Sequence, residues 1–404
     1  MNTGGLRGVR VLDFTQVWAG PYCSMLLAFN GAEVIKVESE KRPDRTRFFS
    51  VTLATTYKGK DESQLYNNLN LNKLDITLNL SHPQGVELAK DIAKVCDVVV
   101  ENFRPGVMDR LGLDYEALRQ VRPDIVYLSS SSRGSTGPEW NYAGYAPTFA
   151  ALSGLSHLTG HRDGTPSLMS GRTDLLVGTS AFLAIMAALI YRSRTGKGQY
   201  IDLSSSEAIS VLIGDTFMDY AMNGREQTRN GNRDPSMAPH NCYRCQGEDK
   251  WISIAVASEE EWQSFCNAIN NPEWTKDARF ADAFSRKANE DELDRLISEW
   301  ALNHTHYEAM ELLQGAGVAA MPTFSSEELF DNPHLRERRV YTEIDHPVIG
   351  KQTLVGEPWK LSATPAAVTR HAPLFGEHNQ YVFGKLLGMP TARLEQLQKE
   401  HIIY

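Results

Sequence analysis

Short hydrophobic runs alternate with helical stretches over the first half of the chain. Runs typical of strands lie at Val9–Phe14, Glu33–Glu38, Leu74–Leu80, Asp97–Glu101 and Asp124–Ser130. The last two are of the kind found in strands buried on both faces of a sheet. Strands that alternate with helices predict βαβ units, and therefore a mainly parallel, doubly wound sheet.

The segments between these strands carry helix signals. A helix is expected from Gly20 to Phe29. Ser81 is expected to cap a second helix, because Pro83 follows in its first turn and apolar residues recur at helical spacing. The segment after Asp174 is apolar on nearly every side, which predicts a buried central helix. A further strand is expected at Tyr200–Leu203.

The pattern changes near residue 223, where a polar, turn-rich segment begins. Behind it, Cys242–Gln246 and Trp251–Val256 are separated by Gly-Glu-Asp-Lys and predict a hairpin. Helical patterns then cover Glu259–Ile269, Glu290–Asn303 and His306–Gly315. This part of the chain is therefore expected to be a compact α+β unit.

Strand patterns return after residue 325, and two helices are expected after Gly376. The fold class predicted is α/β, with a doubly wound, Rossmann-like large domain and a smaller α+β domain. Residues 1–222 would begin the large domain, residues 223–324 would form the small domain with its linkers, and residues 325–404 would complete the large domain.

Composition narrows the choice of partners. The chain has 404 residues and a formal net charge of −9, which argues against nucleic acid as a partner. No run reaches the ~18 apolar residues of a membrane span, and the N-terminal segment lacks the apolar core of a signal peptide. Five cysteines, an odd number, favour a reducing cytoplasm over a disulfide framework. We therefore expect a cytoplasmic protein with no nucleic-acid or membrane partner.

One carboxylate stands directly before the long apolar helix. Asp174 lies between Gly171 and Gly178, and small residues of this kind can admit a substrate. A helix N-terminus also supports an anion, so Asp174 is a candidate nucleophile. The alternative is an ordinary N-cap aspartate. Spacing alone leaves both interpretations open.

Cationic residues gather where the predicted strands end. They are Arg45, Arg47, Lys73, Arg104 and Arg110. In open α/β sheets ligands bind outside the carboxyl ends of the strands, where such cations could hold phosphates. Phe103 or Trp18 could offer a face to a purine ring. The alternative is a solvated charged rim, with Phe103 in the core.

Other motifs are missing or incomplete. Cys242 and Cys245 have the spacing of half a zinc site, but no second pair completes it, so both are interpreted as structural and no metal is expected. The chain has no glycine-rich dinucleotide motif after its first strand, no P-loop and no nucleophile elbow. Nicotinamide, nucleoside-triphosphate and the usual hydrolase chemistries are therefore disfavoured.

Several segments together resemble one family, in that family's order along the chain. They are VRVLDFTQVWAGPYCSMLLAFNGAEVIKVE, NLNLNKLDITLNL, VVVENFRPGVMDRLGLDYEAL, ALSGLSHLTG, the Asp174 segment, RSRTGKGQYIDLS and PLFGEHN. The chain is similar, from end to end, to the class III coenzyme A (CoA) transferases of the CaiB/BaiF type. The resemblance implies a two-domain protomer that dimerises as two interlocked rings.

The resemblance also assigns residues. Asp174 matches the family's catalytic aspartate. The residues expected to bind CoA are Gln16, Val17, Trp18, Ala19, Arg47, Leu71, Asn72, Lys73, Asn102, Phe103, Arg104 and Arg110. The CoA thioester would be a substrate, and no tightly bound cofactor is expected.

The activity implied is transfer of CoA from an acyl-CoA donor, here succinyl-CoA, to a carboxylic acid. It would proceed through a mixed anhydride and an aspartyl-CoA thioester on Asp174. A glycine-rich loop shields the intermediates in the family, whereas the corresponding segment here, 230–235, has no run of glycines.

Two alternatives stay open. The first is a 2-methylacyl-CoA racemase, although such relatives carry a His-Asp pair where this chain has Tyr145-Ala146, so one of the two bases is missing. The second is a CoA-binding subunit of a hetero-oligomeric transferase. A homodimer or a hetero-oligomer with a related chain would each fit the family.

The acceptor acid is only weakly indicated. Trp18, Tyr145 and Phe149 suggest room for an aromatic group, and Arg172 or His240 could pair with a second carboxylate. These residues favour an aromatic or dicarboxylic acid such as a substituted succinate, as in the succinyl-CoA:benzylsuccinate CoA-transferase group. Alternatively, the aromatic residues are simply part of the core.

Overall fold

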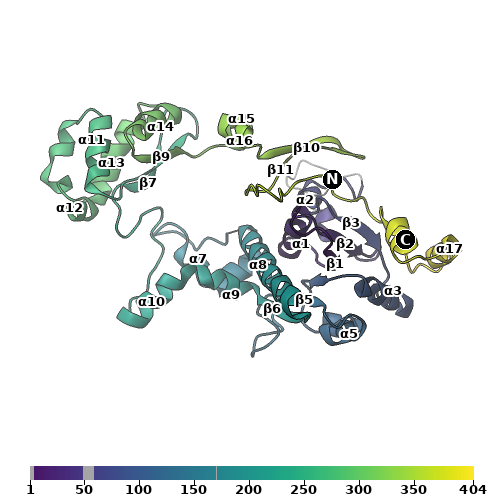
Figure 1. Cartoon of the computed structure of the whole chain (residues 1–404). Helices are drawn as coiled ribbons and strands as arrows, with labels where there is room; N and C mark the ends of the chain where they lie inside the picture. Colours follow the sequence, from purple (N-terminus) through teal and green to yellow (C-terminus); the bar gives the residue numbers. More distant parts are fainter. Residues whose placement is uncertain (1–3, 49–58, 170) are drawn as a thin grey trace. The chain divides into compact units, whose positions relative to one another are not determined.

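The computed structural model describes residues 4–48, 59–169 and 171–404, and it divides into two compact units (Figure 1). The first unit runs up to Ser156, from Leu168 to Arg225, and from Arg336 onward. The second comprises His157–Ser167 and Glu226–Leu335. The sequence placed the boundaries after residues 222 and 324 and kept residues 157–167 in the large domain.

A six-stranded parallel sheet forms the centre of the first unit. Its strands are β1 (Arg10–Asp13), β2 (Glu33–Glu38), β3 (Leu74–Thr77), β4 (Val98–Glu101), β5 (Val126–Ser131) and β6 (Gln199–Ser204). Their order is β3-β2-β1-β4-β5-β6, and every neighbouring pair is parallel. This is the order of the doubly wound folds: β1 to β3 are added toward one edge of the sheet, and β4 returns to the other side of β1 and starts toward the opposite edge. The predicted α/β class with a parallel sheet is confirmed.

Alternate residues of the strands bury opposite faces of the sheet. Val98 and Val100 pack with α1 (Ala19–Phe29) and α8 (Arg172–Thr195). Val99, between them, packs instead with α3 (Pro83–Lys94). Both faces are therefore covered, which explains why these strands are apolar at consecutive positions.

The cap predicted for α3 is one residue off. Ser81 lies outside the helix, and the N-cap is His82, whose Nδ1 accepts a hydrogen bond from the backbone N–H of Gln84. Pro83 occupies the first helical position, as expected.

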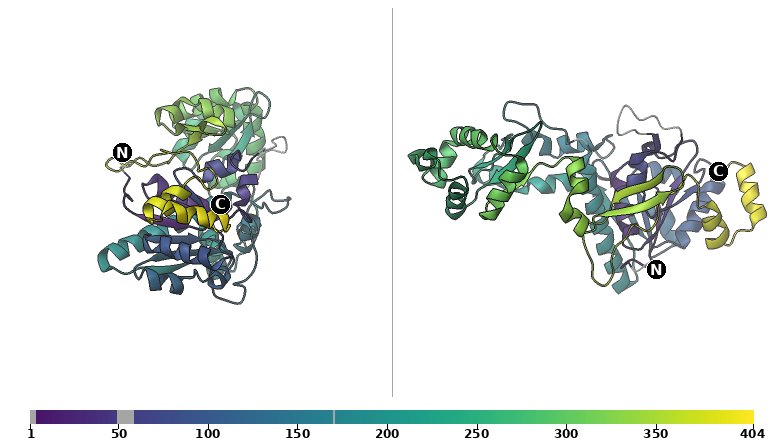
Figure 2. Two further views of the ribbon diagram at one scale, coloured as in Figure 1. Left: turned by 90° about the vertical axis from the view of Figure 1, so that its right-hand side faces the viewer. Right: turned by 90° about the horizontal axis from the view of Figure 1, so that it is seen from above.

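The C-terminal segment covers the open edge of β3. The Asn379 Oδ1 accepts a hydrogen bond from the Thr77 backbone N–H, and the Thr77 hydroxyl donates to the Tyr404 carbonyl. The segment continues through a π-helical turn at Gln380–Leu386 and α17 (Thr391–Lys399), which pack on the same face as α3. Figure 2 shows this yellow C-terminal part beside the purple and blue strands and helices.

The helix α8 is buried on one side only. Val177, Ala181 and Ile185 are buried, but Leu183 is 69% exposed and Ile190 is exposed too. By length and mean hydropathy, 1.9 over its most apolar window, α8 could cross a membrane, and 33% of that window is buried in the described chain. The prediction of a helix buried all round is therefore wrong for the single described chain.

The second unit has its own core. An antiparallel sheet of β7 (His240–Arg244), β8 (Trp251–Ala255) and β9 (Ala319–Pro322) contains the predicted hairpin. Around it lie α11 (Glu259–Ala268), α13 (Glu290–Ala301) and α14 (His306–Gly315).

The structure also contains further helices and a second hairpin. They are α2 (Gln64–Leu69), α4 (Val107–Leu111), α5 (Tyr115–Val121), α6 (Ala146–Leu152), α7 (Leu155–Leu158), α9 (Ser205–Ser210), α10 (Gly214–Asn223), α12 (Ala283–Ala288), α15 (Ser326–Asp331), α16 (Pro333–Glu337), and the hairpin β10 (Tyr341–His346) and β11 (Gly350–Val355). A 3₁₀ turn at Arg45–Phe48 follows β2.

Candidate active site at the carboxyl ends of the strands

A cavity of about 700 Å³ opens where β1, β4 and β5 end. Its walls are the loops after β1 and β4, the end of β5 and the first turn of α8. Because β1 and β4 flank the point at which the strand order reverses, this is the place where doubly wound folds bind their ligands.

Most of the residues predicted for the site line this cavity. They are Asp174, Gln16, Val17, Trp18, Ala19, Asn102, Phe103 and Arg104. Segments that lie far apart in the sequence therefore meet in one place.

Two hydrogen bonds connect the loop after β1 to the loop after β4. The Gln16 backbone N–H donates to the Asn102 Oδ1, and the Asn102 Nδ2 donates to the Gln16 carbonyl, both at 2.8 Å. Gly20, at the start of α1, lets these loops approach, since a Cβ there would lie 3.0 Å from the Asn102 side chain and 2.5 Å from that of Thr15. Asn102 therefore holds the two walls of the cavity together.

The loop after β1 is strained at Val17. Its φ of 72° is a left-handed value, which is rare for a β-branched residue. Asp44 accepts a hydrogen bond from the Val17 N–H at 3.2 Å and helps to hold this conformation. Strain that is held in this way concentrates at functional sites.

Trp18 lies against the first turn of α8. A Cβ on Gly171 would come within 2.6 Å of the Trp18 ring, and Gly171 itself has a φ of 80°. Glycine is therefore required at this N-cap on two grounds. The close approach brings the indole beside the turn that carries Asp174.

Asp174 is the third residue of α8, and its side chain faces the cavity from a mostly buried position. Burial raises the pKa of this carboxyl to about 6. Among the described residues, no hydrogen bond or ion pair to the carboxylate is found. One turn later Gly178 packs directly on Ala19, where a Cβ would lie 2.6 Å from the carbonyl oxygen. Asp174 is thus a desolvated carboxylate on a firmly packed helix.

Three arginines line the same cavity: Arg45, Arg104 and Arg172. Their charges outnumber that of Asp174, so the cavity favours an anionic ligand. Arg104 also donates to the Asn141 carbonyl at 2.9 Å. Arg104 also borders a neighbouring cavity of about 380 Å³. The other charged residues that line this second cavity are Glu101, Asp109, Asp114 and Glu116, so the cationic region ends at Arg104.

Arg47 is not part of the cavity, which corrects the prediction for this residue. Its side chain has no exposed surface and pairs with Glu38 at 2.7 Å and with Asp61 at 2.7 Å. Its guanidinium also lies over the Tyr66 ring, 3.6 Å from the centroid. Arg45 and Arg47 belong to one 3₁₀ turn, in which residues two apart point in different directions, so Arg45 faces the cavity instead.

Lys73 is also buried, contrary to the prediction that it binds phosphate. Its ammonium contacts Asp13 at 3.2 Å, the Pro21 carbonyl and the Asn70 side chain. Asp13 in turn accepts hydrogen bonds from both the backbone and the hydroxyl of Thr15. Lys73 therefore stabilises the loop after β1 through its contacts with Asp13 and Pro21, which lie on either side of that loop.

Leu71, Asn72 and Arg110, also predicted to bind CoA, do not line the cavity. Leu71 is fully buried among Met25 and Phe29. Asn72 binds the backbone of the C-terminal segment, and Arg110 is exposed on α4. His240, considered for an acceptor carboxylate, lies on β7 in the second unit.

The sequence interpretation missed a row of hydroxyls. Ser130, Ser131 and Ser132 line the cavity at the end of β5. The Oγ atoms of Ser131 and Ser132 are buried without a hydrogen-bond partner. The run Ser-Ser-Ser-Ser at 129–132 was visible in the sequence, but only the position of β5 shows that its last three residues line the same cavity as Asp174.

Comparison with known proteins identifies the family to which the chain belongs. The family model described as CoA-transferase family III matches residues 6–379. The chain belongs to CoA-transferase family III.

Characterised relatives agree with the family assignment. The succinyl-CoA:glutarate CoA-transferase of Homo sapiens is 32% identical over 403 residues, covering 100% of this chain and 90% of the relative. The succinyl-CoA–D-citramalate CoA-transferase of Chloroflexus aurantiacus is 33% identical over 98% of both chains. The crystal structure of a CaiB/BaiF family protein from Brucella suis superposes with a TM-score of 0.86 at 29% identity, covering 95% of this chain and 100% of that one.

These findings confirm that the protein is an enzyme of the family III CoA-transferase type. CoA thioesters and carboxylic acids are the substrates that this family exchanges.

Proposed function

We propose that this family III CoA-transferase moves CoA from succinyl-CoA to a carboxylic acid, with Asp174 as the nucleophile. The observation that carries the proposal is the buried Asp174 carboxylate in a cavity lined by arginines. A carboxylate taken out of water and left without a partner is a better nucleophile than a solvated one.

The reaction would proceed in balanced steps. An Asp174 oxygen attacks the thioester carbonyl, the C–S bond breaks, and CoA leaves as a thiolate from a mixed anhydride. The thiolate then attacks the Asp174 carbonyl, which forms an aspartyl-CoA thioester and releases succinate. The acceptor carboxylate repeats these steps in reverse, so the free energy of the thioester is conserved.

Each step passes through an oxyanion that needs hydrogen-bond donors. The buried hydroxyls of Ser131 and Ser132 lack partners and line the same cavity, so they are candidates for this role. Arg45, Arg104 and Arg172 would attract the phosphates of CoA and the carboxylate of the acceptor.

The acceptor proposed is a dicarboxylic acid with an apolar or aromatic substituent. Glutarate and D-citramalate, named for two relatives, are both dicarboxylates. Trp18, Tyr145 and Phe149 line the cavity and would accommodate a larger group, as in a substituted succinate such as benzylsuccinate. A panel of acids assayed with succinyl-CoA tests the preference, and faster turnover of monocarboxylates than of any dicarboxylate would reject it.

The mechanism is tested by trapping the intermediate. The enzyme is incubated with succinyl-CoA, treated with hydroxylamine or borohydride, and analysed by intact and peptide mass spectrometry. The modification is expected on the peptide that carries Asp174 and should be missing from Asp174→Asn. A modification at another carboxylate, or none with turnover intact, would reject Asp174 as the nucleophile.

The exposed apolar surface supports a second chain. Leu183 on α8 and Phe217, Met218 and Met222 on α10 are all more than half exposed. Such surfaces mark interfaces, and an interlocked dimer with a copy or with a related chain would cover them. Light scattering is expected to give twice the mass of the 45.2 kDa chain, and a monomer at working concentration would reject the proposal.

We also propose a cytoplasmic location. All five cysteines are free in the described structure, and four of them are buried. Free thiols of this kind suit a reducing compartment. Cell fractionation tests the location, and recovery of the enzyme with an oxidising compartment would reject it.

A further inference from the structure

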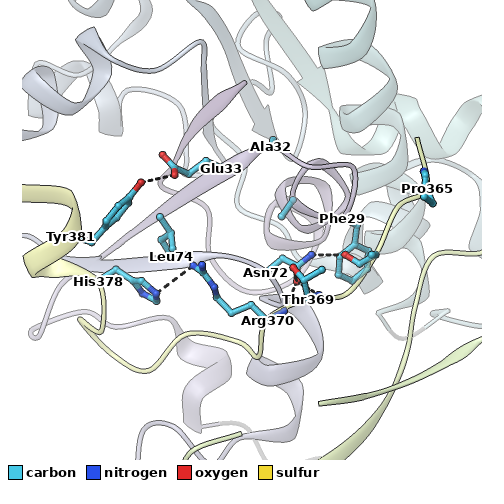
Figure 3. Close-up of a pocket in the computed structure, with 12 residues that line it drawn as sticks. Phe29, Ala32, Glu33, Asn72, Leu74, Pro365, Thr369, Arg370, His378 and Tyr381 are labelled. Carbon is cyan, nitrogen blue, oxygen red and sulfur yellow. Dashed lines mark hydrogen bonds between the residues drawn. The ribbon is translucent and has the colours of Figure 1, made fainter. Parts of the chain in front are cut away.

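A second cavity lies at the opposite edge of the parallel sheet. Its volume is about 450 Å³, and its walls include Glu33 and Leu74, the first residues of β2 and β3 (Figure 3). The proposed active site lies where strands end, so this cavity is separate from it. The C-terminal segment contributes Arg370, His378 and Tyr381 to its walls.

Hydrogen bonds to β3 fix the protonation of His378. The Asp75 backbone N–H, on the open edge of the sheet, donates to the His378 Nδ1 at 3.2 Å. The His378 backbone N–H donates back to the Asp75 carbonyl at 2.9 Å. Because Nδ1 accepts a hydrogen bond, the proton of the neutral ring must be on Nε2.

The protonated Nε2 faces a second donor. A dashed line in Figure 3 joins the Arg370 Nη1 to the His378 Nε2, 3.5 Å away. With the proton on Nε2 neither nitrogen can accept a hydrogen bond, so this contact brings two donors together. Burial lowers the pKa of His378; the Glu377 carboxylate opposes this shift, and the Arg370 guanidinium adds to it. Two donors side by side without an acceptor form a site for an oxygen of an anion.

Asn72 holds Arg370 in this position. The Asn72 Oδ1 accepts hydrogen bonds from the backbone N–H groups of Thr369 and Arg370, at 2.7 and 2.9 Å. The Asn72 backbone N–H donates to the Arg370 carbonyl at 3.1 Å. Asn72 itself has a φ of 64°, a conformation that asparagine tolerates better than most residues. The donor pair is therefore preorganised by the backbone.

The rest of the cavity indicates an organic ligand with one charge. Phe29, Ala32 and Leu74 give it an apolar wall, and its volume holds on the order of ten water molecules, more than a bare inorganic anion fills. Glu33 also lines it, with its carboxylate bound by Arg10 and by the Tyr381 hydroxyl. A second carboxylate on the ligand would be repelled by Glu33.

We propose that this cavity is a second acid-binding site, which holds a short monocarboxylate with its head on Arg370 and His378 and its apolar chain on Phe29 and Leu74. The choice of a carboxylic acid rests on the family III activity, which consumes and releases such acids at the active site. Through this site, the concentration of free carboxylic acid would influence the enzyme at a position other than Asp174.

The test follows the ring of His378 by NMR in the full-length enzyme labelled with ¹⁵N-histidine. The chain has 11 histidines, and the resonance missing from His378→Gln identifies the right one. Butyrate is expected to shift this resonance saturably, and Arg370→Gln should weaken the apparent affinity about tenfold or more. Arg119→Gln, an exposed arginine paired with Glu116 on α5, is the matched control and should bind butyrate normally.

Ligand and background controls complete the design. Butyramide lacks the charge and should leave the resonance unmoved, and succinate should bind more weakly than butyrate. The butyrate shift should persist in Asp174→Asn, which separates this site from the proposed nucleophile. An unmoved His378 resonance, an equal response to butyramide, tighter binding of succinate or inorganic phosphate, or unchanged affinity in Arg370→Gln would each overturn the proposal.

Discussion

At the scale of single residues, the protonation of Asp174 should control the rate. Its pKa is raised to about 6 by burial, and only the carboxylate can attack the thioester. We expect kcat/KM for succinyl-CoA to fall about tenfold per pH unit as the pH drops below about 6. Stopped assays across the pH range measure this, with circular dichroism to confirm that the enzyme stays folded. A profile that stays flat well below that pH would contradict the pKa assigned to Asp174.

The Asp174 carboxylate should also lower the free energy of unfolding at neutral pH. The Asp174 pKa rises from 3.8 in the unfolded chain to about 6 in the folded protein, so the folded state binds more protons between these values. The free energy of unfolding therefore decreases as the pH rises through this window, and the loss is complete above it. Asp174→Asn should abolish transfer yet raise the free energy of unfolding at neutral pH by about 1–3 kcal/mol. Denaturant unfolding measures this, and the difference should disappear near the pKa of the unfolded carboxyl.

Single residues also show where sequence reasoning stops. Arg45 and Arg47 look alike in the sequence, yet one lines the cavity and the other is buried beside Glu38. The directions of the two side chains depend on a 3₁₀ turn that the local sequence pattern does not predict. Lys73 carries the charge expected of a phosphate ligand, but its acceptors come from Asp13 and Pro21, distant in sequence.

At the scale of elements, prediction succeeded wherever burial is periodic. All six parallel strands coincide with short hydrophobic runs, and β4 and β5 are apolar at consecutive positions because helices cover both sides of the sheet. The loops at the strand ends were recognised by resemblance, and their meeting depends on Asn102, whose two hydrogen bonds no spacing rule could supply.

Removing this side chain should loosen the site without unfolding the protein. Asn102→Ala deletes both hydrogen bonds between the loops after β1 and β4. We expect the KM for succinyl-CoA to rise roughly tenfold, with a smaller change in kcat, because ligand positioning is lost before chemistry. Steady-state kinetics measure it. Asn303→Ala, an exposed asparagine in the second unit, serves as the control and should leave KM unchanged.

At the scale of the whole molecule, Arg47 joins distant parts of the first unit. It pairs with Glu38 at the end of β2, with Asp61, and with Asp75 on β3, and it reaches the Pro373 carbonyl of the C-terminal segment. Arg47→Met would leave buried carboxylates uncompensated. We expect the free energy of unfolding to fall by about 3–5 kcal/mol, while the enzyme that remains folded keeps its KM for succinyl-CoA. A raised KM with unchanged stability would instead place Arg47 at the ligand.

The edge of the sheet also bears on how the chain folds during synthesis. The backbone N–H of Thr77 on β3 donates its hydrogen bond to Asn379, which lies 302 positions later in the chain. The ribosome must therefore synthesise the chain beyond residue 379 before the free edge of β3 is covered. Until then, the unpaired backbone groups of β3 can form hydrogen bonds with other polypeptide chains. Nascent chains stalled before residue 376 should be held by chaperones more tightly than chains released at full length.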